Sequence, residues 1–341
     1  MVETLAADWY VDEAIFRRER RAIFARNWCL FGPEAEFAEP GAFRAERING
    51  WPVVVVRGKD RALRGFHNVC RHRAAAPFAS GPGRCEVIRC PYHGWTYDSA
   101  GALVAAPNFG DDPGFDKAAY GLFPVRVEVW RGLVFFCIDA ATPDLMTWLG
   151  AIPALCEPYP GPAEREYYGS FIVEGAANWK TYCDNTVEGY HLPFIHPRLF
   201  RAVVPDKVDL RAYDGGRCVA FQVTYRDDGA GLRGRDGLWF YRFPGFQATL
   251  SATALKAERI EPLGARGLKS ASWQWFNGIP DEGRRDAFQW ARTIVEEDVG
   301  ICETVQQNLE AGVYRSGRLS PKQEGMVALF QALVRAAVTD E

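Results

Sequence analysis

Four of the five histidines in this 341-residue chain stand in short spacings that suit metal binding. One residue separates Cys70 from His72, two separate Cys90 from His93, and seventeen lie between the pairs. Two thiolates and two imidazoles in such pairs can hold either one zinc ion or a [2Fe–2S] cluster whose outer iron is bound by the imidazoles. A structural zinc loop usually has gaps of about two to four residues in both pairs. The one-residue gap at Arg71 therefore favours iron and sulfide.

A second histidine pair, His191 and His196, follows two carboxylates in the segment NWKTYCDNTVEGYHLPFIHP, residues 178–197. With Asp184 and Glu188 the spacing is D-x3-E-x2-H-x4-H. Two histidines and one carboxylate on one face of an octahedral iron leave positions open for dioxygen and substrate. This group predicts a separate mononuclear metal site. A chain with both an electron-transfer cluster and a catalytic iron is expected to activate oxygen.

The two patterns together resemble the Rieske non-heme iron oxygenases, the terminal oxygenase (alpha) components of the ring-hydroxylating oxygenase family. The first pattern is similar to the Rieske motif and reads CRH at 70–72 and CPYHGW at 90–95. The resemblance implies that the two cysteines bind one iron of a [2Fe–2S] cluster and the two histidines bind the other. Imidazoles in place of thiolates lower the negative charge of the cluster and raise its reduction potential.

The resemblance also implies that His191 and His196 bind a mononuclear non-heme Fe(II). In the family, the third ligand is an aspartate on a helix in the C-terminal region. Asp298, in the segment EEDVGICE at residues 296–303, is the predicted ligand, and Glu297 is the alternative. Without the rest of the pattern, these acidic residues would be interpreted as a solvated helix face.

The carboxylate that precedes the first iron histidine is usually Asp in this family, and here it is Glu188. In the family it bridges a cluster histidine of one subunit to an iron histidine of its neighbour. The resemblance therefore implies an electron path through His93, Glu188 and His191 that crosses between subunits, commonly in a homotrimer. The longer glutamate can still orient both imidazoles. Asp184 is the second acidic residue to which we assign a catalytic role.

The source of electrons and the substrate follow less directly. The sequence has no C-x4-C-x2-C run of a plant-type ferredoxin, so the electrons are expected from NAD(P)H through a separate reductase or ferredoxin. The aromatic-rich stretch 239–276 can line a pocket for an aromatic ring, cage a quaternary ammonium, or simply form the core of a sheet. Glutamate at 188 resembles the branch of the family that oxidises carnitine and related betaines. Hydroxylation of an aromatic compound and N- or O-demethylation stay open.

An alternative function is that of a Rieske electron-transfer protein without oxygenase activity, which needs only the first metal group. A zinc-binding structural module needs neither redox activity nor the second histidine pair. His191 and His196 argue against the electron carrier, and the one-residue gap in the first pair argues against zinc.

The composition is that of an ordinary globular protein, with 48% apolar and 24% charged residues. A formal net charge of −3 gives no reason to expect a nucleic-acid surface, and the basic run at 17–21 is predicted to be a solvated helix face. No run approaches the roughly 18 apolar residues of a membrane span, and the first residues lack the features of a signal peptide. We therefore expect a cytoplasmic protein that binds no membrane.

Nine cysteines argue against a disulfide framework, because full pairing would leave one over and no export signal is seen. Most are expected to be small buried side chains. Cys85 lies between the two ligand pairs and is a minor candidate for an additional ligand.

The elements that must position these residues begin with a helix at 13–28, which Asp12 can cap. The continuous apolar runs at 53–56 and 133–136, separated by Gly and Pro, predict buried strands. A segment rich in Pro and Gly at 149–164 is expected to connect this β-rich part to the rest of the chain.

The remaining sequence predicts a helix at 178–190 that carries the second histidine pair near its end. Strand-like alternation follows at 217–277, and helical patterns span 284–309 and 323–338. The predicted class is α+β, with a β-rich Rieske domain inserted before a catalytic domain whose antiparallel sheet is flanked by helices. The expected parts are an N-terminal helix packing on the catalytic domain at 1–29, the Rieske domain at 30–148, and the catalytic domain at 149–341.

Overall fold

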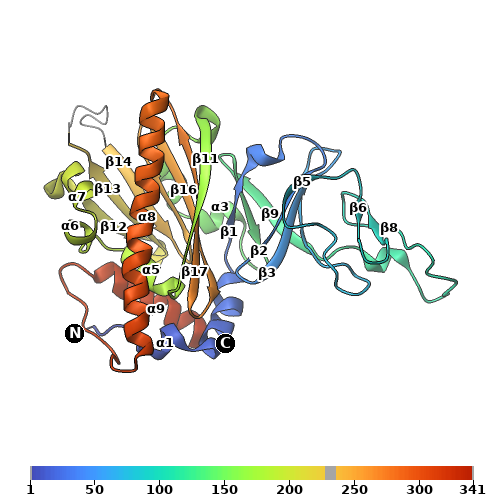
Figure 1. Ribbon diagram of the computed structural model, residues 1–341, viewed down its shortest axis with the longest axis horizontal. Coiled ribbons are helices and arrows are strands. Elements are labelled where there is room, and N and C mark those ends of the chain that lie inside the picture. Colours follow the sequence, from blue (N-terminus) through green and yellow to red (C-terminus); the bar gives the residue numbers. More distant parts are fainter. Residues whose placement is uncertain (1, 227–235, 340–341) are drawn as a thin grey trace. The chain divides into compact units, whose positions relative to one another are not determined.

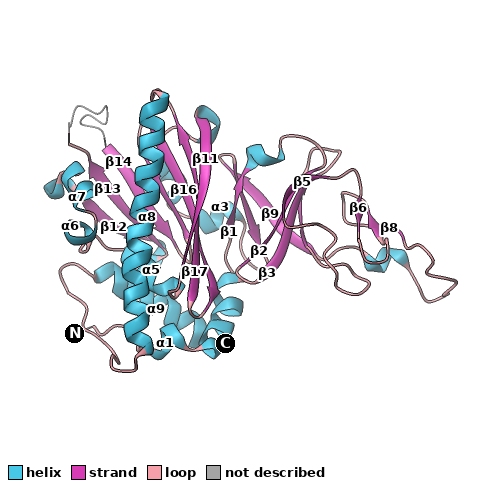
Figure 2. Cartoon of the chain, in the orientation of Figure 1, coloured by secondary structure: helices cyan, strands magenta, loops and turns pink. Residues whose placement is uncertain are grey.

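The computed structural model describes residues 2–226 and 236–339 and divides the chain into two compact units (Figure 1). The larger unit combines Met1–Cys29 with Met146–Glu341, and the smaller unit is Leu30–Leu145. The mixed content of helices and antiparallel sheets confirms the predicted α+β class (Figure 2). Among the described helices, none is long and apolar enough to cross a membrane.

The smaller unit is built on a seven-stranded sheet with the order β1-β10-β9-β4-β3-β2-β5. Its strands are β1 (Cys29–Pro33), β2 (Ala42–Ile48), β3 (Trp51–Arg57), β4 (Leu63–His67), β5 (Gly81–Arg84), β9 (Pro124–Trp130) and β10 (Leu133–Cys137). The apolar runs at 53–56 and 133–136 lie in β3 and β10 and are buried, as their continuous hydrophobic sequence predicted.

A small antiparallel sheet of three strands completes this unit, with the order β6-β7-β8. Its strands are β6 (Ile88–Arg89), β7 (Thr96–Tyr97) and β8 (Leu103–Ala105), and short 3-10 helices occur at Glu34–Phe37 and Lys117–Tyr120. The Cys90–His93 pair lies in the connection between β6 and β7, whereas the Cys70–His72 pair follows β4. Two different sheet connections therefore supply the first ligand group.

The larger unit contains a second seven-stranded sheet, antiparallel throughout, with the order β11-β17-β16-β15-β14-β13-β12. Its strands are β11 (Glu166–Gly175), β12 (Asp209–Tyr213), β13 (Cys218–Thr224), β14 (Asp236–Arg242), β15 (Phe246–Leu250), β16 (Ala254–Gly264) and β17 (Gly267–Phe276). Most aromatic side chains at 239–276 are buried in this unit, namely Phe240, Tyr241, Phe243, Phe246, Trp273, Trp275 and Phe276. Trp239 is the half-buried exception.

Helices pack against this sheet, and the long α8 runs along it (Figure 1). The helices of the unit are α1 (Asp8–Val11), α2 (Glu13–Glu19), α3 (Leu145–Leu149), α4 (Ile152–Cys156), α5 (Trp179–Thr186), α6 (Leu192–Ile195), α7 (Pro197–Ala202), α8 (Asp281–Glu310) and α9 (Gly325–Thr339). Short 3-10 helices lie at Pro162–Glu164, Pro205–Lys207 and Asp214–Gly216. Buried side chains from α5, α8, α9 and the sheet form one hydrophobic core.

Two predicted helices are shorter than their sequence patterns indicated. The N-terminal helix changes at Arg20–Phe24 into a π-helical turn, which shifts the inward face so that Glu19 and the following apolar residues are both buried. The helix expected at 178–190 ends at Thr186, because the Glu188 carboxylate accepts hydrogen bonds from the next backbone N–H groups in place of helical carbonyls.

Asn178 fixes the start of α5 and joins it to three other parts of the larger unit. Its side-chain oxygen accepts a hydrogen bond from the Lys180 N–H at 3.0 Å, which caps the helix. Its side-chain nitrogen donates to the carbonyls of Tyr10 at 3.0 Å and Ala265 at 2.7 Å. Its backbone N–H donates to Gln306 of α8 at 3.1 Å. One buried amide therefore sets where α5 begins relative to α8 and the N-terminal segment.

A fully buried ion pair attaches α2 to α5. The Lys180 ammonium lies 2.6 Å from one Glu19 carboxylate oxygen, and both side chains are 0% exposed. The Trp179 indole N–H donates to the other Glu19 oxygen at 2.9 Å. Because the desolvation cost of such a pair is balanced only when both charges are present, removing one partner is far more costly than removing both.

We predict that Lys180→Met destabilises the larger unit by about 3–5 kcal/mol, because it leaves the Glu19 carboxylate buried without a cation. Adding Glu19→Gln should recover most of the loss, since glutamine carries no charge and its oxygen can still accept from Trp179. Urea unfolding followed by tryptophan fluorescence measures both variants. A double variant as unstable as the single one would contradict the ion-pair explanation.

Candidate metal centres

The two cysteines and two histidines of the smaller unit lie on two turns with the same hydrogen-bond pattern. In the first turn the Ala74 N–H donates to the Cys70 carbonyl at 3.0 Å, and the Cys70 N–H donates to Ala75 at 2.8 Å. In the second turn the Gly94 N–H donates to the Cys90 carbonyl at 3.1 Å, and the Cys90 N–H donates to the Trp95 carbonyl at 2.8 Å. The residue four positions after each cysteine has a positive φ, 59° at Ala74 and 73° at Gly94. Glycine adopts this conformation without strain, which explains its position after the second histidine.

Burial separates the four ligand candidates into an inner and an outer pair. Cys70 and Cys90 are 2% exposed, whereas His72 is half-buried and His93 is exposed. The two imidazole centroids are 4.6 Å apart. Soft thiolates inside and imidazoles at the surface fit a [2Fe–2S] cluster with its histidine-bound iron outermost. One zinc ion would instead be expected to draw all four side chains into a single closed tetrahedral site.

Tyr97 and Trp95 contact this group from the second turn and the strand that follows it. The Arg71 N–H donates to the Tyr97 hydroxyl at 3.0 Å, which leaves the hydroxyl proton for the Cys70 sulfur at 3.2 Å. Hydrogen bonds to cluster sulfurs are one means of setting a reduction potential. The His72 ring stacks on Trp95 with centroids 4.9 Å apart. Sequence reasoning noted Trp95 but missed Tyr97, whose contact depends on how the two turns meet.

The second histidine pair lies at the helix ends that follow α5. His191 precedes α6 and His196 stands between α6 and α7. Pro193 and Pro197 occupy the first turns of these helices, where a missing N–H costs nothing. The two prolines therefore break the chain into short helices, as the sequence indicated, and both rings turn toward α8.

Asp298 of α8 meets both histidines. One ligand atom from each of His191, His196 and Asp298 can be chosen so that all lie within 4.8 Å of one another. An Asp298 oxygen is 2.8 Å from Nε2 of His196 and 3.7 Å from Nε2 of His191. This two-histidine, one-carboxylate set fits a non-heme iron with further positions open. The Asn185 amide also donates to Asp298 at 2.6 Å, a contact that the sequence did not predict.

The remaining nitrogen of each ring is held by a different carboxylate. Glu188 lies 2.5 Å from Nδ1 of His191, and its other oxygen accepts from the backbone of Tyr190 and of His191 itself. Glu297 lies 2.7 Å from Nδ1 of His196. Because a carboxylate only accepts hydrogen bonds, each contact favours a proton on the Nδ1 that faces it. The Nε2 of each ring lies toward Asp298. Glu297, the alternative third ligand in the sequence, is therefore on the side of His196 that faces away from Asp298.

Asp184 has a different setting from the other predicted site residues. It accepts hydrogen bonds from the Tyr10 hydroxyl at 2.7 Å and from the Gln331 amide of α9 at 3.0 Å. Burial raises the pKa of its carboxyl to about 7, and these two donors act in the opposite direction. These contacts join α5 to the N-terminal segment and α9, so a structural role is enough to explain an aspartate at position 184. Its catalytic role stays a prediction.

Cys85, the minor ligand candidate, is half-buried, and its backbone N–H donates to the Gly41 carbonyl at 2.9 Å. Burial raises the pKa of its thiol. Its backbone contact ties it to the start of β2, which is not part of either ligand-bearing turn.

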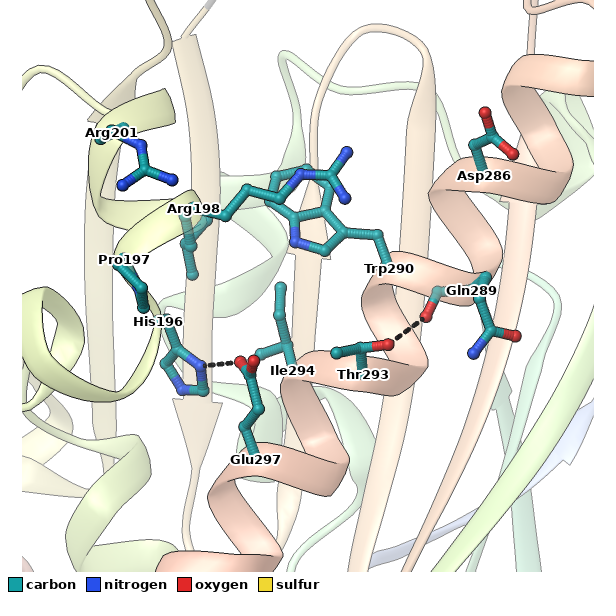
Figure 3. Close-up of a pocket in the computed structure, with 11 residues that line it drawn as sticks. His196, Pro197, Arg198, Arg201, Asp286, Gln289, Trp290, Thr293, Ile294 and Glu297 are labelled. Carbon is teal, nitrogen blue, oxygen red and sulfur yellow. Dashed lines mark hydrogen bonds and ion pairs between the residues drawn. The ribbon is translucent and has the colours of Figure 1, made fainter.

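A pocket of about 350 Å³ lies between α7 and α8 next to the second metal group (Figure 3). His196 and Glu297 line it, together with Arg198 and Trp290. The Arg198 guanidinium stacks over the Trp290 ring at 4.6 Å. The Glu297 side chain is 42% exposed here, whereas the His196 side chain is 1% exposed.

Family models match both parts of the chain. Residues 163–340 match the ring hydroxylating alpha subunit (catalytic domain), and residues 27–120 match the Rieske [2Fe-2S] domain. The carnitine monooxygenase oxygenase subunit of Acinetobacter pittii (strain PHEA-2) is 28% identical, over 96% of this chain and 92% of its own length. The chloroplastic choline monooxygenase of Arabidopsis thaliana is 29% identical, over 92% of this chain and 78% of its own.

Solved structures agree with these matches. A quaternary ammonium Rieske monooxygenase in complex with gamma-butyrobetaine is 27% identical, covers 98% of this chain and 95% of its own, and has a TM-score of 0.87. Naphthalene 1,2-dioxygenase, at 23% identity and a TM-score of 0.81 over 98% of this chain and 92% of its own, shows the same fold. The alpha-subunit model alone spans more than half of the sequence. The chain therefore belongs to the ring-hydroxylating oxygenase alpha subunits: it is a Rieske non-heme iron oxygenase with a [2Fe–2S] cluster and a mononuclear iron, and it takes its electrons from a separate partner.

Proposed function

We propose that this oxygenase acts on a small quaternary ammonium compound, which it hydroxylates or demethylates with O2. The relatives with 28–29% identity over nearly the whole chain are named for carnitine and choline. Glutamate at position 188 is the second support, because it resembles the betaine-oxidising branch of the family. An aromatic substrate is the alternative, and naphthalene dioxygenase supports it only through its fold.

Aromatic side chains on the sheet are our candidates to contact the proposed cation. The Phe221 ring lies next to Gly189, and Gly189 belongs to the turn that joins Glu188 to His191. Trp239 follows, with its centroid 6.1 Å from Phe221, and its indole N–H donates to the Tyr225 hydroxyl at 2.8 Å. A quaternary ammonium is attracted to the faces of such rings, and Trp is the strongest of them. The half-buried Trp239 is the residue that we assign to substrate recognition.

The proposed ligand sets are those whose side chains converge in each unit. Cys70, His72, Cys90 and His93 would hold the cluster, and His191, His196 and Asp298 would hold the mononuclear iron. Bound iron supplies the one-electron and O2 chemistry that no side chain provides. The protein residues orient the imidazoles, and Asn185 fixes the carboxylate of Asp298.

We further propose a homotrimer in which Glu188 connects His191 to the partner subunit's His93. Glu188 already contacts Nδ1 of His191. Beside it, Tyr190 and Phe194 are 51% and 77% exposed, an unusual exposure for aromatic side chains next to a buried site. One related structure is described in terms of inter-subunit electron transfer. A cytoplasmic location, where NAD(P)H and its reductase are available, is part of the same proposal.

The substrate proposal is tested by oxygen uptake with the reduced protein and a panel of betaines and aromatic acids, after iron, sulfide and EPR analysis has established both centres. We expect betaines to stimulate uptake and neutral tert-butyl analogues to bind more weakly. Trp239→Leu should raise KM for the betaine roughly 2- to 30-fold, the range of a cation–π contact of about 0.5–2 kcal/mol. Trp239→Phe is the matched control, and its KM should lie between those of the wild-type protein and Trp239→Leu. Stimulation by aromatic acids alone would overturn the proposal.

For the iron ligand, Asp298→Ala should lose the mononuclear iron, because two imidazoles alone form an incomplete site. The cluster lies in the other unit, so its visible absorbance and EPR signal should be unchanged. Metal analysis gives the ratio of iron to sulfide. A full iron complement in this variant would show that Asp298 is not the ligand.

For the electron path, Glu188→Ala should leave both metal centres bound but slow re-oxidation of the reduced cluster by O2 and substrate. We expect a loss of about 10- to 100-fold, the usual effect of removing a carboxylate behind a ligand imidazole. Stopped-flow absorbance of the cluster measures this rate directly. Re-oxidation at the wild-type rate would exclude Glu188 as the connection between subunits.

A further inference from the structure

We propose that Glu297 is a positioning residue for the mononuclear iron site, which holds His196 in the orientation and tautomer that metal binding requires. This inference rests on the proposed ligand set and adds a second carboxylate, distinct from Glu188, with a different task. Glu188 is assigned to electron transfer between subunits, whereas Glu297 is assigned to holding the ligand imidazole.

The backbone around His196 does not fix its ring. The residue ends α6 and precedes α7, with φ −120° and ψ 60°. Its N–H donates to Leu192 and its carbonyl accepts from Phe200, so both backbone groups are used in the two helices. The ring itself is fixed by side-chain contacts, and the polar ones come from Glu297 and Asp298.

Two consecutive residues of α8 engage opposite nitrogens of this ring. Successive residues of an α-helix point about 100° apart, so Glu297 and Asp298 diverge from the helix and can take the imidazole between them. Glu297 contacts Nδ1 at 2.7 Å and Asp298 contacts Nε2 at 2.8 Å. A carboxylate at Nδ1 favours a proton there, and Nε2 would then bind the metal together with Asp298. Figure 3 shows the contact between His196 and Glu297 at the side of the pocket between α7 and α8.

The exposure of Glu297 suits this task. Its side chain is 42% exposed in the pocket, so an ionised carboxylate keeps much of its hydration and incurs little desolvation cost. It can therefore accept a strong, charge-assisted hydrogen bond from the Nδ1–H of the buried imidazole. Arg198, a cation of the same pocket, stacks its guanidinium over the Trp290 ring at 4.6 Å. Glu188, by contrast, is only 9% exposed.

The test compares Glu297 with its neighbour Glu296, which lies on the same helix, is 44% exposed and pairs with Arg292. Glu297→Ala should weaken Fe(II) retention against a graded series of chelator concentrations by about 10- to 100-fold. Glu297→Gln should lose less, because its amide oxygen can still accept from Nδ1. Glu296→Ala and Glu296→Gln should match the wild-type protein. The cluster EPR signal should be the same in all variants and reports that the fold is intact.

Iron retention in Glu297→Ala equal to that in Glu296→Ala would overturn the proposal. Cluster re-oxidation is measured at saturating Fe(II) and expressed per bound iron, and it should stay near the wild-type rate in Glu297→Ala. A slow rate with normal iron affinity would assign Glu297 to electron transfer and would also overturn the proposal. Failure of the ligand set itself would appear separately, as full iron retention in Asp298→Ala.

Discussion

The metal site of the larger unit depends on one constraint: the His196 imidazole must fit between α7 and two consecutive carboxylates of α8. The ring is almost fully buried and has a polar partner at each nitrogen. These contacts span about a hundred residues of sequence, so the site exists only when α5, α6, α7 and α8 keep their relative positions. Packing and buried hydrogen bonds must supply that accuracy, because an error of about 1 Å is enough to impair a functional site.

Much of the larger unit serves to place the start of α5. Asn178 connects this helix to the N-terminal segment, the turn between β16 and β17, and α8. Glu19 and Lys180 add a buried ion pair from α2. Such polar contacts contribute little net stability compared with apolar packing, but a misplaced helix would leave them unsatisfied. They therefore favour one position of α5, which in turn sets where His191 and His196 lie.

In the smaller unit, the positions of the ligand candidates depend mainly on local backbone structure. Two turns of the same geometry each carry one cysteine and one histidine, so the ligand order within each turn is set by a few backbone hydrogen bonds. The two sulfurs are buried, whereas His72 is half-buried and His93 is exposed, so a cluster held by these residues would have its histidine side toward the surface. The two units thus divide the work: one exchanges electrons at its surface, and the other holds a catalytic metal within its core.

The sequence by itself determined the α+β class, the Rieske motif, the oxygenase family and the helix-breaking role of the prolines around His191 and His196. The class, the motif and the helix breaks depend on neighbours within a few residues or on continuous apolar runs, so spacing and residue type suffice. The oxygenase family followed from the resemblance of the two metal-binding patterns to that family. Only the tertiary structure separated Glu297 from Asp298, because adjacent carboxylates on a helix differ in direction and not in chemistry. It also showed that Asp184 accepts hydrogen bonds from Tyr10 and Gln331, and that Asn185 donates one to Asp298. These contacts join residues more than a hundred positions apart, and their partners are decided by how helices pack on the sheet.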